Sequence, residues 1–238
     1  MKSNHLEIVQ TADGSNTIYN AQVGEHYHSR NGALQESRHV FVNAGLCYHL
    51  EKTQFPEVSL FGGDLEGATA SILEVGFGTG LNFLLSADLC AEKQIQLEYT
   101  GIEAYPLTNE MINKTGYDQY VSAHLWQSFI NNYKERLSSP VKLSPYCKLQ
   151  IANCQLLDFH EEKQYDIIYY DAFAAARQPE MWYDEAIAHT VKFLKPGGVF
   201  VTYAITGNLK RTLKALGCAI EKVPGAAGKR EMLRAVKI

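Results

Sequence analysis

The sequence predicts an α/β fold in which a mostly parallel sheet carries helices on both faces. The first observation is that strand-like and helical segments alternate from residue 71 onward. The second is a glycine-rich turn that joins an apolar run, residues 72–75, to a helical pattern beginning at Leu81. The third is an acidic residue, Glu103, at the end of the next strand-like run.

The N-terminal quarter predicts an extension of different character. Residues 6–23 alternate as in a hairpin, with Asp13-Gly14-Ser15 as its turn. Residues 25–50 read as a loop leading into a helix with an apolar face. We therefore expect residues 1–60 to form a hairpin and helix extension, and residues 61–238 to form the main domain.

Seven strands and four helices account for the main domain. The predicted strands are 71–75, 97–103, 146–152, 165–171, 198–205, 218–223 and 231–236. The predicted helices lie near 80–91, 119–137, 183–193 and 208–216. Pro224-Gly225 separates the last two strands, which suits a tight connection between them.

Composition favours a cytoplasmic globular protein. The chain has 238 residues, of which 46% are hydrophobic and 20% charged. It has neither an apolar stretch long enough to cross a membrane nor the apolar core of a signal peptide. The five cysteines are scattered and never spaced as C-x-x-C, which argues against a disulfide framework or a zinc cluster. His26 and His28 lack a third ligand at suitable spacing, so we expect no metal site.

Charge is unevenly distributed along the chain. The net charge is −4, but residues 206–238 hold eight Lys or Arg against two Glu, a local +6. A basic end on an acidic body is suited to a phosphate backbone. The alternative is a solvated helix face with charged hairpin rims.

The glycine turn indicates the ligand class. Glu74-x-Gly76-x-Gly78-x-Gly80 exposes backbone amides and a helix N-terminus to a ligand. It departs from the dinucleotide pattern G-x-G-x-x-G, because Leu81 stands where the third glycine belongs. The spacing resembles the first motif of S-adenosylmethionine-dependent methyltransferases. Glu103, about twenty residues further on, is then placed to bind ribose hydroxyls, the alternative being a solvated charge at a strand end.

A second carboxylate marks the fourth strand of the main domain. That strand delivers Asp171 to the carboxyl edge of the sheet, where ligands bind in such folds. Small residues follow Asp171 and leave room for a substrate, and Phe173 and Trp182 offer aromatic rings for stacking. The alternative makes Asp171 a helix N-cap and Trp182 a core residue.

Several segments resemble one methyltransferase family over almost the entire chain. They are Leu73 to Asn82, Asp171 to Trp182, Gly228 to Leu233, and the N-terminal Asp13-Gly14-Ser15, Tyr27-His28-Ser29, Gly32-Ala33 and Glu36-Ser37. They look like the methyltransferase half of the bifunctional tRNA wobble-uridine enzyme family MnmC. The resemblance implies a Rossmann-like class I methyltransferase sheet of seven strands with the last antiparallel. It implies methylation of the exocyclic amine of 5-aminomethyl-(2-thio)uridine at the tRNA wobble position, in the anticodon region.

The resemblance also implies site residues. Asp171 is the expected catalytic residue, orienting the amine. The expected S-adenosyl-L-methionine contacts are Glu74, Gly76, Gly78, Gly80, Asn82, Glu103, Asn153 and Cys154. The expected substrate contacts are Tyr27, His28, Ser29, Phe173, Trp182, Lys229 and Arg230.

Three departures from the family pattern qualify these expectations. Ala175 stands where the family usually has proline, and Asn153-Cys154 stands where it often has Gly-Asp after the third strand, the aspartate of which would bind the adenine amino group. The flavin oxidase half has no counterpart and no G-x-G-x-x-G is present, so we expect no FAD. The rival interpretations are a methyltransferase of a small amine or metabolite, a non-catalytic binding module on a nucleotide-binding fold and, more distantly, an aminopropyltransferase.

Overall fold

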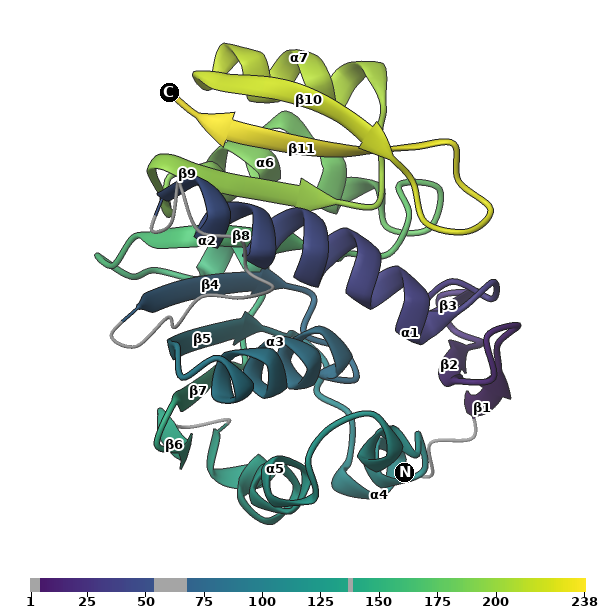
Figure 1. Cartoon of the computed structure of the whole chain (residues 1–238). Helices are drawn as coiled ribbons and strands as arrows, with labels where there is room; N and C mark the ends of the chain where they lie inside the picture. The colour runs from purple at the N-terminus through teal and green to yellow at the C-terminus, as the bar shows by residue number, and fades with distance from the viewer. Residues whose placement is uncertain (1–4, 54–67, 137–138) are drawn as a thin grey trace.

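An eight-stranded sheet forms the centre of the molecule in the computed structural model, which describes residues 5–53, 68–136 and 139–238 (Figure 1). The strand order is β10-β11-β9-β8-β4-β5-β7-β6. The strands are β4 (Thr69–Val75), β5 (Gln96–Ile102), β6 (Val141–Ser144), β7 (Cys147–Ala152), β8 (Tyr165–Tyr170), β9 (Leu194–Thr202), β10 (Cys218–Pro224) and β11 (Glu231–Lys237).

Strand directions confirm the predicted class. β4, β5, β7, β8 and β9 pair in parallel, whereas β11 runs antiparallel between β9 and β10. In Figure 1 the arrowheads of β9 and β10 accordingly point one way and that of β11 the other. All seven predicted strands are present. The eighth, β6, was not predicted, because four residues joined to β7 through a bulge carry too short a pattern to recognise.

Helices cover both faces of the sheet. α3 (Leu81–Glu92) and α5 (Ala123–Arg136) belong to one core, and α6 (Asp184–Val191) and α7 (Gly207–Ala215) to the other. The shorter helices are α4 (Asn109–Asn113) and the 3-10 turns η2 (Tyr117–Gln119), η3 (Leu156–Asp158) and η4 (Pro179–Trp182). Among the described residues, no helix combines the length and apolarity that a membrane crossing requires.

The N-terminal segment forms a small sheet and one long helix. β1 (Leu6–Gln10) and β2 (Asn16–Asn20) form the predicted hairpin, and β3 (Glu25–His26) adds a third strand. The predicted helix is built from α1 (Ala33–Glu36), the π-helix η1 (Ser37–Cys47) and α2 (Tyr48–Thr53). The small sheet lies beyond the ends toward which β9 and β10 point (Figure 1). The N-terminal segment is thus placed where the parallel strands deliver their side chains.

The long helix packs directly against the central sheet. The ring centroids of Phe41 and Tyr169 lie 5.2 Å apart. A Cβ on Gly45 would come within 2.8 Å of the Tyr169 ring, so this glycine permits the close approach. The two predicted parts therefore share one core. The boundary at residue 60 lies outside the described residues, and the division into two domains stays a prediction.

The turn of the β1–β2 hairpin caps the start of the long helix. The side chains of Thr11, Ser15 and Asp13 accept hydrogen bonds from the amides of three consecutive residues, Ala33, Leu34 and Gln35. These amides belong to the first helical turn, where no partner within the helix exists. The hairpin therefore fixes where the helix begins, and with it the position of Glu36 at the cavity described below.

Candidate active site

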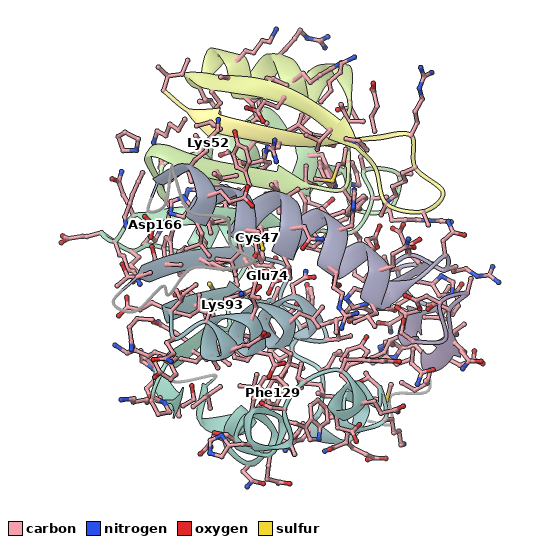
Figure 2. The ribbon with its side chains drawn as sticks, viewed as in Figure 1. Cys47, Lys52, Glu74, Lys93, Phe129 and Asp166 are labelled. Atoms are coloured by element: carbon pink, nitrogen blue, oxygen red, sulfur yellow. The ribbon has the colours of Figure 1, made fainter. Side chains whose placement is uncertain are left out.

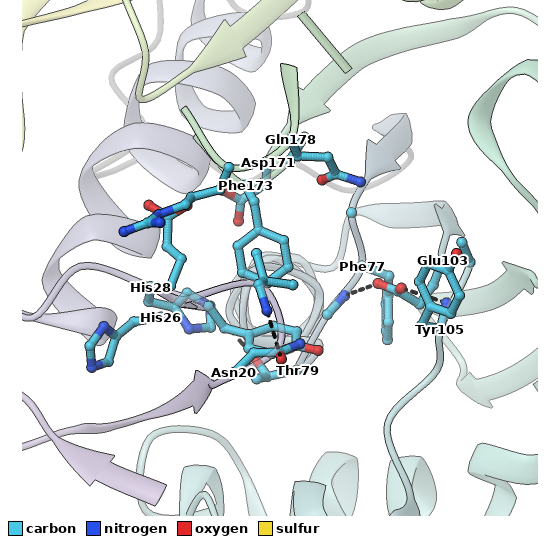
Figure 3. A pocket seen from close by; sticks show the side chains of 18 of the residues that line it. Asn20, His26, His28, Phe77, Thr79, Glu103, Tyr105, Asp171, Phe173 and Gln178 are labelled. Atoms are coloured by element: carbon cyan, nitrogen blue, oxygen red, sulfur yellow. Dashed lines mark hydrogen bonds between the residues drawn. The ribbon is translucent and has the colours of Figure 1, made fainter. Parts of the chain in front are cut away.

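A cavity of about 960 Å³ lies at the carboxyl ends of the central strands (Figure 3). The residues that follow β4, β5, β7, β8 and β9 line one side of it, and residues from β2, β3 and the loop after them line the other. Figure 3 shows Asp171 and Phe173 between His28 on one side and Glu103 on the other. This is the position in which open α/β sheets bind ligands.

Gly76 and Gly78 of the glycine turn line the cavity, whereas Gly80, the third predicted glycine contact, lies outside its lining. Gly76, Gly78 and Gly80 all have positive φ, at 84°, 52° and 77°. A Cβ on Gly76 would lie 2.6 Å from the backbone oxygen of Asp171, and one on Gly78 would lie 2.9 Å from the ring of Tyr27. Glycine is required here both by conformation and by contact. The absence of side chains at Gly76 and Gly78 thus lets Asp171 and Tyr27 lie close to the turn, whose Phe77 and Thr79 also line the cavity.

Glu103 lies at the end of β5 with its carboxylate fixed. Oε2 accepts a hydrogen bond from the Gly78 amide at 2.8 Å, and Oε1 accepts one from the Tyr105 amide at 2.9 Å. Burial raises the pKa of Glu103, and these backbone amides oppose the increase. Each carboxylate oxygen keeps acceptor capacity for a ligand hydroxyl. Tyr105, at 73% exposure, offers a large aromatic ring beside it.

The loop after β7 contributes Cys154 and Gln155 to the cavity. The side chain of Asn153 turns elsewhere and donates to the carbonyl oxygens of Glu103 and Ala104, at 3.0 and 3.3 Å. Asn153 therefore joins the ends of β5 and β7, and it is not among the residues lining the cavity.

Glu74 and Asn82 form a buried polar network beneath the cavity. Asn82 Nδ2 donates to Glu74 Oε1 and to Asp171 Oδ2, both at 2.8 Å. The hydroxyl of Tyr99 donates to Glu74 Oε2 at 2.8 Å. Burial and the charge of Asp171 raise the pKa of Glu74 well above its usual range. Neither Glu74, visible in the interior in Figure 2, nor Asn82 lines the cavity; both support Asp171 instead.

Asp171 lies at the cavity wall directly after β8. Its backbone amide donates to the Val75 carbonyl at 2.9 Å, which fixes the residue beside the glycine turn. Burial and the charge of Glu36 raise the pKa of Asp171 to about 8, against the opposing effects of the Asn82 hydrogen bond and the charge of Lys229. A carboxyl group with this pKa exchanges a proton near neutral pH, as a general base requires.

Two aromatic rings line the cavity beside Asp171. Tyr27 and Phe173 have ring centroids 5.1 Å apart in an edge-to-face arrangement. Trp182 differs from the expectation, because it is buried behind the wall, with ring centroids 5.3 and 6.1 Å from those of Tyr170 and Tyr203. Its indole nitrogen donates to the Phe173 carbonyl at 2.7 Å. Trp182 therefore positions Phe173 and does not line the cavity.

His28 and Ser29 line the side of the cavity that the N-terminal segment forms. His28 is buried, and burial lowers its pKa to about 4, so the ring is neutral near pH 7. Its ring nitrogens lie 3.4 Å from the hydroxyl of Thr17 and 3.5 Å from that of Thr79, which joins the small sheet to the glycine turn. The Ser29 amide donates to Glu36 at 2.8 Å. Within the described residues, no three His, Cys, Asp or Glu are grouped to hold a metal ion.

Lys229 and Arg230 occupy different environments although they are adjacent in sequence. Lys229 lines the cavity, where its Nζ pairs with Glu36 Oε1 at 2.8 Å and lies 3.8 Å above the ring of Tyr203. Arg230 is exposed and lies outside the cavity lining. The structure thus brings only one of the two predicted cations into the site.

The lining residues that were not among the predicted contacts include four charged residues and a tyrosine: Glu25, Arg30, Glu36, Arg177 and Tyr203. Tyr203 directly follows β9, so its position at the carboxyl edge was the signal available in the sequence. Glu36 belongs to one of the segments that carried the family resemblance. The other three have no such signal, because only the fold places them at the cavity.

Comparison with known proteins adds a family match to this geometry. A family model described as S-adenosyl-L-methionine-dependent methyltransferase matches residues 119–238, which is half of the chain. This chain belongs to that methyltransferase family.

Two curated relatives of the methyltransferase carry the same name. A tRNA 5-methylaminomethyl-2-thiouridine biosynthesis bifunctional protein MnmC from Magnetococcus marinus is 29% identical over 92% of this chain and 32% of that protein. Its counterpart from Pseudomonas savastanoi pv. phaseolicola is 31% identical over 87% of this chain and 31% of that protein. The methyltransferase spans about a third of the length of these relatives.

One solved structure confirms the fold. The structure of MNMC2 from Aquifex aeolicus aligns with a TM-score of 0.72 and 22% sequence identity, over 97% of this chain and 70% of that one. The α/β sheet with its antiparallel last strand and N-terminal sheet is therefore an arrangement that a known protein shares.

The cavity of the methyltransferase fits S-adenosyl-L-methionine. Its volume of about 960 Å³ lies within the range typical of small-molecule sites. Gly76 and Gly78 line the cavity without side chains of their own, and Glu103 presents a carboxylate already held by two amides. A glycine backbone that allows close approach, beside a fixed acceptor for hydroxyl groups, suits the ribose of a nucleoside.

Proposed function

We propose that this methyltransferase transfers a methyl group from S-adenosyl-L-methionine to the exocyclic amine of 5-aminomethyl-(2-thio)uridine at the tRNA wobble position. The observation that carries the proposal is Asp171, a carboxyl group with a pKa of about 8, held at the cavity wall beside Tyr27 and Phe173. The relatives named for biosynthesis of 5-methylaminomethyl-2-thiouridine in tRNA support this choice of substrate.

We assign the glycine-turn side of the cavity to the cofactor. The backbone around Gly76 and Gly78 would hold its amino acid part, and Glu103 would accept hydrogen bonds from the ribose hydroxyls. Cys154 and Gln155 line the part of the cavity left for adenine, where the family's acidic residue is absent. When bound, S-adenosyl-L-methionine supplies an electrophilic methyl group on a sulfonium centre.

We assign the other side of the cavity to the uridine. Tyr27 and Phe173 provide the aromatic surfaces against which a base stacks when it leaves its helix. Glu25 Oε2 accepts a hydrogen bond from the Ala174 amide at 3.0 Å and so holds the loop that carries Phe173 against β3. An amine on the base would then lie near Asp171.

Asp171 would act on the proton of the amine. Only the neutral amine has a lone pair for attack, and the amine is mostly protonated near neutral pH. Because the pKa of Asp171 is raised to about 8, its carboxylate is basic enough to take an ammonium proton and then accept a remaining N–H. Asn82 fixes one carboxylate oxygen, so the group reaches the amine in one orientation. Holding the amine in near-attack geometry supplies most of the rate.

The proposal assigns only the methyl-transfer step to this chain. That step needs no FAD, because it involves no oxidation. Contact with the anticodon region of tRNA, and a cytoplasmic location where tRNA is found, belong to the same proposal.

Methyl transfer from labelled cofactor to tRNA tests the proposal, with small amines as the alternative acceptors. We expect tRNA to be labelled at the wobble uridine, and the single-turnover rate to rise with pH through the pKa of Asp171. Asp171→Ala should lower that rate by about 10²- to 10⁴-fold. Asp118→Ala, at an exposed position outside the cavity lining, is the matched control.

Two outcomes would contradict the proposal in different ways. Labelling of small amines without tRNA would support the small-molecule alternative. A single-turnover rate on tRNA that survives Asp171→Ala unchanged would remove Asp171 from the mechanism while leaving the substrate in place.

A further inference from the structure

An ion pair between the buried Glu36 and the partly exposed Lys229 links two distant parts of the chain at the cavity. Glu36 is only 6% exposed, and its Oε1 lies 2.8 Å from Lys229 Nζ. Its Oε2 accepts the Ser29 amide at 2.8 Å, so both oxygens of the carboxylate are engaged. Glu36 comes from the long N-terminal helix and Lys229 from the connection before β11. The pair therefore joins the long N-terminal helix to the β10–β11 connection at the cavity wall.

A chain of contacts connects this ion pair to Ala172, the residue that follows Asp171. Lys229 Nζ lies 3.8 Å above the ring of Tyr203. The Tyr203 hydroxyl donates to the carbonyl of Ala172 at 2.9 Å. Ala172 directly follows Asp171, so the lysine, the tyrosine and the carboxyl-bearing loop are held in one arrangement. Glu36, Lys229 and Asp171 all line the same cavity.

Charged and polar groups from several elements surround Asp171. Asn82 of α3 donates a hydrogen bond to it, and Glu74 of β4 shares the same amide group. The other groups facing it or interacting with it electrostatically are Glu36, Lys229, Tyr99 and Tyr203. Of these, Glu36 raises the pKa of Asp171 and Lys229 lowers it, so the two members of the ion pair oppose each other. The remaining groups belong to the buried network beneath the cavity or to the aromatic wall.

We propose that Glu36 and Lys229 are positioning residues that jointly set the charge of the Asp171 carboxyl group for the substrate amine. The inference rests on the proposed function for its purpose, but the effect on Asp171 belongs to the protein alone. A contact that only joined the long helix to the β10–β11 connection would not need charge, because apolar residues of similar volume can stabilise such a contact as well as an ion pair does. The negative charge of Glu36 favours the protonated form of Asp171, and the positive charge of Lys229 favours its carboxylate, so the pair balances the two forms.

If Glu36 and Lys229 set the charge of Asp171, their removal should shift the pKa of Asp171 in opposite directions; a purely structural role predicts no such pattern. Glu36→Gln removes a negative charge, so ionisation of Asp171 becomes easier and its pKa should fall by about one unit. Lys229→Met removes a positive charge, so the pKa should rise by about one unit. The double variant removes both charges and should return Asp171 close to its parent value. Lys229→Arg keeps the charge and should leave the titration near that of the parent.

The titration is measured directly on the cofactor-free, full-length protein. Aspartate carboxyl carbons are labelled with carbon-13, and the Asp171 resonance is assigned by its absence in Asp171→Asn. The matched control is the exposed pair Lys222 and Glu231 of the β10–β11 hairpin, whose charged atoms lie 3.8 Å apart. Lys222→Met and Glu231→Gln should leave the Asp171 titration unchanged. Thermal unfolding of each variant shows whether the fold is retained.

The results distinguish the inference from the function. Shifts of opposite sign that cancel in the double variant support the inference. Shifts of the same sign, or none in folded variants, would overturn it and leave an ion pair that only closes the structure. Absence of tRNA methylation by the parent protein would overturn the proposed function without touching the titration. If one single variant fails to fold, the other must still shift the Asp171 titration in its expected direction, and the double variant must reverse that shift; a single variant without a shift overturns the inference.

Discussion

Two carboxyl groups at strand ends acquire different roles from their surroundings. Glu103 is held by the amides of Gly78 and Tyr105, which leave it as a fixed acceptor. Asp171 has one side-chain donor, Asn82, and lies where burial and the charge of Glu36 raise its pKa to about 8. A fixed acceptor suits hydroxyl groups of a bound nucleoside, whereas a carboxyl group titrating near neutral pH suits proton transfer.

Glu103→Ala should weaken S-adenosyl-L-methionine binding by about 10- to 150-fold. A hydrogen bond to a charged group contributes about 1.5–3 kcal/mol, which corresponds to that change in affinity. Titration calorimetry measures it. Glu98→Ala is the matched control, because Glu98 lies on the same strand near its amino end and pairs with Lys163 at 2.7 Å. Unchanged affinity in folded Glu103→Ala would remove Glu103 from the cofactor site.

At the scale of the elements, the start of the long helix depends on the hairpin turn. Gly32 precedes the helix and has no side chain to cap it, so Thr11, Asp13 and Ser15 accept its first amides from across the chain. A Cβ on Gly32 would lie 2.6 Å from the Asp13 carboxylate. A glycine there allows the carboxylate to reach the helix. The same helix carries Glu36 into the cavity, so the cap supports the site.

Asp13→Ala should lower the free energy of unfolding by about 1 kcal/mol, the usual cost of losing a helix cap. Urea denaturation followed by circular dichroism measures the change. Asp13→Asn retains an acceptor oxygen and should cost less than the alanine variant. Equal stability of the alanine variant and the parent protein would show that water replaces the carboxylate at the helix start.

Across the whole molecule, several cations of the basic C-terminal end are engaged by groups of the protein itself, and others face solvent. Lys222, Lys229 and Arg234 pair with glutamates, and Lys237 donates to two backbone carbonyls. The exposed cations include Arg211 and Lys214 of α7 and Arg230. Arg30 and Arg177 add two exposed cations at the cavity itself. A tRNA inserting a nucleotide into the cavity would bring its phosphates to these last two first.

Replacing Arg30 and Arg177 by alanine should flatten the salt dependence of tRNA binding by about 1.4–1.8 in the slope of log K against log salt. Each phosphate contact contributes about 0.7–0.9 to that slope. Arg230→Ala should lower the slope by about 0.7–0.9, the contribution of one phosphate contact. None of these variants should change the affinity for S-adenosyl-L-methionine. Lys148→Ala is the control, since Lys148 lies near the amino end of β7, away from the cavity. An unchanged slope in the arginine variants would place the tRNA surface elsewhere.

The alternation of apolar runs and turns determined the architecture, because local periodicity reports which face of each segment is buried. It placed Asp171 and Glu103 at the carboxyl edge, since strand ends in a parallel sheet share one edge. Periodicity did not predict short or irregular segments. β6 has four residues, and β9 begins at Leu194 and includes Pro196 and Gly197, which strand propensity excludes.

Tertiary structure decided which polar side chains meet. Glu74 and Asn82 lie in the glycine-turn motif, yet packing turns them beneath the cavity toward Asp171. Glu36 and Lys229 are 193 residues apart in sequence, and no periodic pattern relates them. Their pairing depends on how the long helix and the last hairpin close over the sheet. Local sequence determines the direction of each strand and helix, but contact between distant charges follows only from their packing.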